Sequence, residues 1–151
     1  MNKSTVIRRA TEEDAFSIAQ LSSLLGYVAE PTAIARRLRA ITASGSDLLI
    51  VAVAADGTVV GWLQAHAAHI IESGFRVEIV GLIVNPEQRR SGVGRALVAE
   101  AERWAVSSSA EVIVVRSNVQ RVESHAFYPA LGYSPTKTQS VYRKVLRKLD
   151  C

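Results

Sequence analysis

Residues 80–97 read VGLIVNPEQRRSGVGRAL, and this stretch decides how the chain is organised. The run from Val80 to Val84 is apolar, as in a buried strand, and Asn85-Pro86 ends it because proline supplies no hydrogen-bond donor to a sheet. A turn rich in glycine and arginine follows, and apolar residues at helical spacing begin at Val93. The stretch therefore predicts a strand over 76–84, a turn, and a helix over about 93–106.

The turn has the features of an anion site. Glycines let the backbone approach a ligand closely and adopt a positive φ. The first turn of the following helix offers free N–H groups and the positive end of the helix dipole. Arginine adds fork-shaped donors that suit phosphate oxygens. We therefore predict a pyrophosphate cradle that comprises Arg89, Arg90, Ser91, Gly92, Val93, Gly94 and Arg95.

Two other phosphate-binding motifs fit less well. A P-loop requires GxxxxGK[ST], which the sequence lacks. A Rossmann turn requires GxGxxG or GxGxxA directly after the strand, whereas seven residues separate Val84 from Gly92, and Leu97 stands at the third position. The pattern Arg-x-x-Gly-x-Gly fits residues 89–94. The alternative is a tight turn whose arginines are merely solvated.

The rest of the chain alternates between the periods of strands and helices. Helices are predicted from the Thr11 cap through Leu21, from Pro31 onward, over 93–106 and over 119–131. Strands are predicted at 5–8, 48–54, 58–66, 76–84, 111–116 and 140–146, with a hairpin turn at Asp56-Gly57. The order β-α-α-β-β-β-α-β-α-β predicts an α+β fold, in which a mixed sheet is flanked by about four helices. We expect a single domain over 1–151.

Residues 117–133, SNVQRVESHAFYPALGY, form the second informative stretch. Taken with residues 89–94, the sequence resembles the GNAT superfamily of acyl-CoA N-acyltransferases, with Phe127, Tyr128, Gly132 and Tyr133 in register with that family's pattern. The resemblance spans nearly the whole chain. It implies a GNAT-like fold and acetyl-CoA as co-substrate.

The resemblance also assigns cofactor contacts. In the family, the turn that matches residues 89–95 holds the pyrophosphate of coenzyme A. The matching strand end pairs its backbone with the pantetheine arm, which assigns Leu82, Ile83 and Val84 to the cofactor. Asn118 matches a residue that contacts the same arm, and Ser124 is expected close to it. A solvated turn residue is the alternative for Asn118.

Two residues are the candidates for acid–base chemistry. The resemblance makes Tyr128 the acid that protonates the leaving thiolate, and the alternative is a core aromatic residue. Pro129 is expected to break or kink the helix next to Tyr128. Glu78 is the candidate base, because period-two alternation places it on one face with Val80, Leu82 and Val84. The alternative is an exposed or ion-paired glutamate, with Arg76 as its partner.

The predicted function is acetyl transfer from acetyl-CoA to a primary amine, by direct attack without a covalent enzyme intermediate. A small, aminoglycoside-like acceptor is favoured over a peptide. The alternative is a non-catalytic CoA-binding sensor or regulatory module. The resemblance also makes a homodimer plausible.

Composition narrows the remaining classes. The formal net charge is +4, and residues 137–151, with five basic residues and one acidic residue, account for all of it. We expect no nucleic-acid partner, because this basic segment is short and no recognition motif accompanies it.

The one cysteine, Cys151, cannot form a disulfide within the chain, which favours a reducing cytoplasm. His66 and His69 are expected on opposite faces of a strand, so no metal site is predicted. No apolar run has the length of a membrane span.

Overall fold

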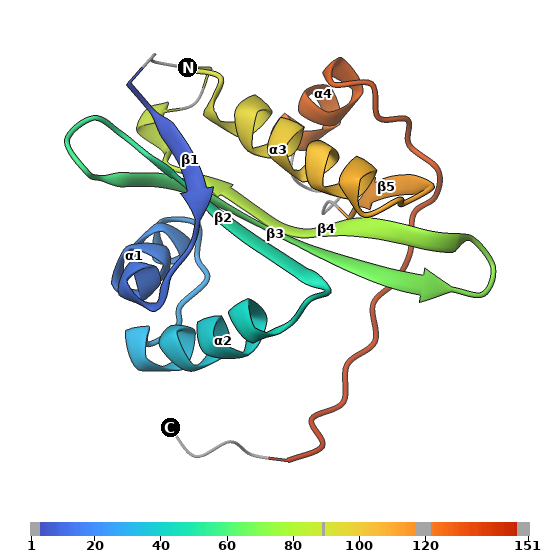
Figure 1. Cartoon of the computed structure of the whole chain (residues 1–151), viewed down its shortest axis with the longest axis horizontal. Coiled ribbons are helices and arrows are strands. Elements are labelled where there is room, and N and C mark those ends of the chain that lie inside the picture. Colours follow the sequence, from blue (N-terminus) through green and yellow to red (C-terminus); the bar gives the residue numbers. More distant parts are fainter. Residues whose placement is uncertain (1–3, 89, 117–121, 148–151) are drawn as a thin grey trace. The chain divides into compact units, whose positions relative to one another are not determined.

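The computed structural model describes residues 4–88, 90–116 and 122–147. The chain divides into two compact units, residues 1–116 and 117–151, which are described separately. The first unit holds a five-stranded sheet with helices on both of its faces (Figure 1). This arrangement confirms the predicted α+β fold class.

The strands lie in the sheet in the order in which they occur in the chain. They are β1 (Val6–Arg9), β2 (Asp47–Val53), β3 (Val59–Ile70), β4 (Gly74–Val84) and β5 (Val112–Val115). The first four pair antiparallel, and β5 runs parallel to β4. A parallel pair needs a crossover connection, which α3 (Val93–Ser107) provides. The sheet is therefore mixed, as predicted.

Helices α1 (Ala15–Leu24) and α2 (Pro31–Ala43) cover one face of the sheet (Figure 1). Pro31 occupies the first turn of α2, where its missing N–H costs nothing. Leu38 from α2, Ile18 from α1 and Val51 from β2 belong to the core between the helices and the sheet. We call this side of the sheet the α1/α2 face.

Helix α3 packs on the opposite face, which we call the α3 face. Its apolar stripe is buried and comprises Val93, Leu97, Val98, Ala101 and Ala105. Gly61 on β3 lies directly beneath this helix. A Cβ at that position would meet Leu97 at 3.2 Å and Val93 at 3.3 Å. The helix therefore approaches the sheet closely because residue 61 has no side chain.

The Asp14 carboxylate links the 3-10 turn after β1 to the strand itself. Asp14 ends the 3-10 turn η1 (Glu12–Asp14) and is 5% exposed. It accepts two hydrogen bonds from the Arg8 guanidinium, at 2.8 and 2.9 Å, and one from the Thr11 N–H at 2.7 Å. These bonds, with the Arg8 hydrogen bonds as the largest cause, hold the pKa of Asp14 below its usual range. The Thr11 cap predicted from the sequence is thus present.

The second unit contains α4 (Val122–Ala130), in agreement with the helix predicted at 119–131. The strand predicted at 140–146 is wrong, because residues 134–147 form neither helix nor strand. Val141 and Tyr142 are exposed, and no strand among the described residues pairs with them. Strand-forming side chains need a ladder partner, and this segment has none here. No helix of the described residues is long and apolar enough to cross a membrane.

Candidate active site

The predicted cradle lies between the end of β4 and the start of α3. A short 3-10 turn, η2 (Pro86–Gln88), leads into it. Arg90 and Gly92 both have a positive φ, of 66° and 87°. Gly92 is the N-cap residue of α3, and no side chain caps the helix there. The first-turn N–H groups of α3 are therefore available to an anion.

The side chains around this turn carry the expected charge. Arg90 and Arg95 are exposed, so their guanidinium groups can reach an approaching phosphate. Val93 is buried under the turn and anchors it to the core. Arg89 was also predicted as a contact, and it lies outside the described residues. The described part of the turn thus combines positive charge with free backbone N–H groups, a combination that suits an anion.

Strands β4 and β5 part beside the cradle. Their ladder runs from Arg76↔Val112 to Ile79↔Val115 and ends there. Residues 80–84 continue β4 while still pairing with β3. Among the described residues no strand pairs with their other side. Backbone groups alternate along a strand, and the Asn85 N–H bonds to the Val60 carbonyl on the β3 side, so the N–H and C=O groups of Leu82 and Val84 face an open edge, while those of Ile83 face β3. An extended ligand arm could pair with that edge as an added strand.

Glu78 lies on β4 one residue before this fork. Its Oε1 forms an ion pair with Arg116 Nε at 2.7 Å, and its Oε2 lies 3.6 Å from Arg76 Nη2. The Glu78 side chain is 19% exposed. The pairing with Arg76 is the alternative that the sequence left open. The sequence did not identify Arg116 as a second partner, because only the parallel register of β5 brings that residue to Glu78.

A bulge in β4 corrects the predicted alternation. Glu78 stands opposite His66, but Gly81 stands opposite Gln64, so Val80 has no opposing residue on β3. Directly opposed residues share a face of the sheet. Gly81 therefore shares the α1/α2 face with Glu78. The prediction that Leu82 and Val84 share a face with Glu78 is wrong, because the extra residue turns both to the α3 face.

Trp62 on β3 lies over Gly81. A Cβ at Gly81 would meet the Trp62 ring at 2.8 and 2.9 Å. The Trp62 Nε1–H is buried and has no hydrogen-bond partner among the described residues. Trp62 belongs to neither of the two sequence motifs that predict the site. Its position could have been found only from the register Gln64↔Gly81, which brings the two residues together.

Tyr128 belongs to the second unit. It lies on α4 next to Pro129, and the helix continues through this proline before it ends at Ala130. The backbone carbonyl of Tyr128 accepts hydrogen bonds from Leu131 and Tyr133 at 3.0 and 3.1 Å. Its ring packs edge-on against the rings of Phe127 and Tyr133. Ser124 is half-buried on the same helix.

Asn118 lies outside the described residues. No cluster of three or more potential metal-ligating side chains occurs in the described part of the chain.

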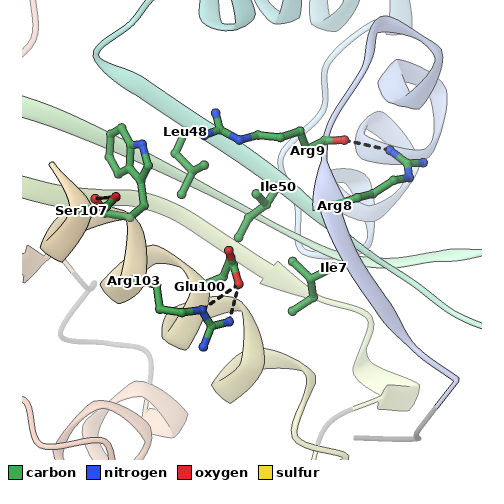
Figure 2. Close-up of a pocket in the computed structure, with 9 residues that line it drawn as sticks. Ile7, Arg8, Arg9, Leu48, Ile50, Glu100, Arg103 and Ser107 are labelled. Atoms are coloured by element: carbon green, nitrogen blue, oxygen red, sulfur yellow. Dashed lines mark hydrogen bonds and ion pairs between the residues drawn. The ribbon is translucent and has the colours of Figure 1, made fainter.

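A pocket of about 490 Å³ lies elsewhere, between β1, β2 and α3 (Figure 2). Leu48, Ile50 and Trp104 contribute apolar surface to it, and Glu100 pairs with Arg103 at its wall. None of the predicted cofactor or catalytic residues lines it. The candidate site is therefore the turn and the fork, not this pocket.

Comparisons with known proteins show which family the chain belongs to. The family model described as acetyltransferase (GNAT) family matches residues 14–133. The chain belongs to the GNAT family of acetyltransferases. It is 31% identical over 144 residues to an aminoglycoside N(6')-acetyltransferase type 1 from Stenotrophomonas maltophilia, and the match covers 93% of each chain. This GNAT protein is thus an acetyl-CoA-dependent N-acetyltransferase.

Two solved structures show the same fold. One is described as a transcriptional regulator from Bacillus halodurans C-125, with a TM-score of 0.84 and 24% identity, covering 93% of this chain and 99% of that one. The other is the aminoglycoside N-acetyltransferase AAC(6')-Iy in complex with CoA, with a TM-score of 0.82 and 22% identity, covering 93% and 94%. Both confirm the GNAT-like architecture.

Proposed function

We propose that this GNAT protein transfers the acetyl group of acetyl-CoA to a primary amine of a small, aminoglycoside-like molecule. One structural observation carries the proposal: the fork between β4 and β5 opens beside the uncapped start of α3, and the carboxylate of Glu78 lies at the fork. The 31% identity to an aminoglycoside N(6')-acetyltransferase supports the acceptor class.

The cofactor assignment follows from the same two features. We assign the pyrophosphate to the turn formed by residues 89–95 and the pantetheine arm to the open edge at Leu82, Ile83 and Val84. Free N–H groups at a helix start and an unpaired strand edge are the two kinds of backbone donor that this cofactor needs. Asn118 and Ser124 are assigned to the cofactor on the family resemblance.

Glu78 is assigned to the acceptor amine. Its carboxylate offers about four acceptor positions. The ion pairs with Arg116, at 2.7 Å, and Arg76, at 3.6 Å, occupy at most two of them, so an ammonium group can still bind there. A carboxylate at this point both attracts the cationic amine and accepts a proton from it. The resulting neutral amine then attacks the thioester carbonyl carbon.

Collapse of the tetrahedral adduct completes the transfer. The C–S bond breaks, the C–N bond stays, and the thiolate takes a proton from the Tyr128 hydroxyl. Tyr128 regains a proton from the acetylated nitrogen. The products are an amide, a thiol and the one proton that the ammonium gave up. The family motif carries the assignment of Tyr128.

The test is release of free CoA thiol with acetyl-CoA and a panel of amines that includes neamine, a peptide N-terminus and a lysine side chain. We expect turnover with neamine and a loss of about 100-fold in kcat for Glu78→Gln. Glu72→Gln is the matched control, because Glu72 is an exposed residue at the β3–β4 turn. Acetyl-CoA binding without turnover on any amine would overturn the proposal.

We also propose that the protein acts in the cytoplasm, without a nucleic-acid partner, and as a homodimer. The single cysteine supports the reducing compartment, and the family resemblance supports the dimer. Light scattering at micromolar concentration tests the dimer, and a mass of 16.3 kDa would show a monomer instead.

A further inference from the structure

Three polar side chains form a row across the α1/α2 face, beyond the end of α2. Asp47 on β2 stands opposite His66 on β3, and His66 stands opposite Glu78 on β4. His66 Nδ1 lies 3.0 Å from Asp47 Oδ1. Opposed side chains on neighbouring antiparallel strands have Cβ atoms about 5 Å apart. His66 is therefore the immediate neighbour of the residue assigned to the acceptor amine.

The bond to Asp47 fixes which nitrogen of His66 can accept a proton. An ionised aspartate only accepts hydrogen bonds, so the Nδ1 of His66 must carry the hydrogen. In the neutral ring the lone pair then belongs to Nε2. No hydrogen bond to Nε2 is found among the described residues. The pair thus presents a ring that is held from one side and ready to take a proton on the other.

The surroundings of the ring suit a proton carrier. The charged groups beside it are Asp47 on β2 and, on the β4 side, Glu78 with its partners Arg76 and Arg116. The His66 side chain is 46% exposed, whereas that of Glu78 is 19% exposed. His66 therefore has the freer path to bulk water.

His69 is on the same strand but has neither an aspartate partner nor a position opposite Glu78. It faces the other side of β3 and lies opposite Phe75. Its ring stacks on the Phe75 ring, with 4.6 Å between centroids. His69 is therefore a packing residue of the hairpin. The two histidines differ in their partners, not in their strand, which makes His69 a matched control.

We propose that His66, positioned by Asp47, receives the proton that the acceptor amine gives to Glu78. The inference deepens the proposed acetyl transfer and rests on it. The ammonium gives one proton to Glu78, and the carboxylate passes it to His66 Nε2 directly or through one water. His66 then releases it to bulk water, and Glu78 returns to its charged form. No group is oxidised or reduced, and the proton is the one that the overall reaction liberates.

The test measures acetyl transfer from acetyl-CoA to neamine by wild type, His66→Ala and His69→Ala. We expect kcat of His66→Ala to fall by about 100-fold, with the KM of both substrates little changed. Added imidazole should raise the kcat of this variant in proportion to its concentration, because the His66 side chain is 46% exposed and a free ring can enter the space that its removal leaves. His69→Ala should keep wild-type kcat and show no response to imidazole.

Asp47 is tested as a positioning residue. Asp47→Ala should lower kcat less than His66→Ala does, and Asp47→Asn should restore most of the loss because its amide oxygen still accepts from Nδ1–H. Thermal unfolding of each variant confirms that it is folded. A His66→Ala enzyme with wild-type kcat, or with a reduced kcat that imidazole does not raise, overturns this inference alone. A wild-type protein that acetylates no amine overturns the proposed function, and the inference with it.

Discussion

Replacing Gly92 with glutamate tests the cofactor cradle by placing a negative charge where a phosphate should bind. Gly92 is the N-cap of α3 and has a φ of 87°. A residue with a Cβ loses about 1–2 kcal/mol in this left-handed region. In a chain of 151 residues that loss lowers Tm by about 2–8 °C. The protein should therefore remain folded at room temperature.

The effect on the cofactor should be much larger. Two like charges about 4 Å apart near a protein surface repel by about 4 kcal/mol. The new carboxylate also competes with phosphate for the first-turn N–H groups of α3. Since 1.4 kcal/mol is a tenfold change in affinity, we expect Gly92→Glu to weaken acetyl-CoA binding by about 1000-fold.

Gly57 provides the matched control. It also has a φ of 87°, and a Cβ there would meet nothing within 4 Å. Gly57→Glu thus introduces the same backbone strain and the same charge, but in the turn between β2 and β3 instead of the turn formed by residues 89–95. Calorimetric titration with acetyl-CoA should give wild-type affinity for Gly57→Glu and almost no binding for Gly92→Glu. Equal affinities for the two variants would refute the cradle.

Three further predictions concern single residues. Tyr128→Phe should lower kcat by about 100-fold with an unchanged Kd for acetyl-CoA, as measured by thiol release and calorimetry; a wild-type kcat would remove Tyr128 as the acid. Asp14→Asn should cost about 2 kcal/mol at pH 7 in urea unfolding, because charged hydrogen bonds to Arg8 are lost. Since folding lowers the pKa of Asp14, wild type holds this advantage above about pH 4 and loses it as the pH falls further; a difference that does not depend on pH would contradict the assignment. Gly81→Ala should cost about 1–3 kcal/mol and shift Trp62 fluorescence, because its Cβ would lie 2.8 Å from that ring, and an unshifted spectrum would contradict the contact.

Local patterns in the sequence were sufficient for most of the fold. The apolar run before Asn85-Pro86, the proline at the start of α2 and the Asp56-Gly57 turn each act over a few residues, so one sequence shows them. The prediction of a strand at 140–146 was wrong because it depended on a distant partner, which local sequence does not show. Valine and tyrosine indicate a preference for extended backbone, but a strand also needs a partner elsewhere in the chain.

In the candidate site, too, features set by neighbouring residues could be predicted, and features that depend on distant residues could not. Glycine and arginine spacing identified the turn at 89–95, because the whole motif is contiguous. The faces of β4 could not be derived from alternation, since a bulge at Val80 moves every later side chain to the other side. The row formed by Asp47, His66 and Glu78 comes from three strands, and the register of two hairpins brings it together.

Gly61 shows that a residue outside the motif can also determine where the turn at 89–95 lies. It is not itself a predicted cofactor-binding residue, yet the close approach of Val93 and Leu97 to the sheet depends on its missing side chain. A larger residue at 61 would push the start of α3 outward and carry with it the turn that we propose binds phosphate. In a survey of variants selected for activity, position 61 should therefore tolerate substitution as poorly as the motif glycines. A loss of activity in a variant at position 61 would be attributed to a folding defect. Its direct cause would instead be displacement of the proposed anion site.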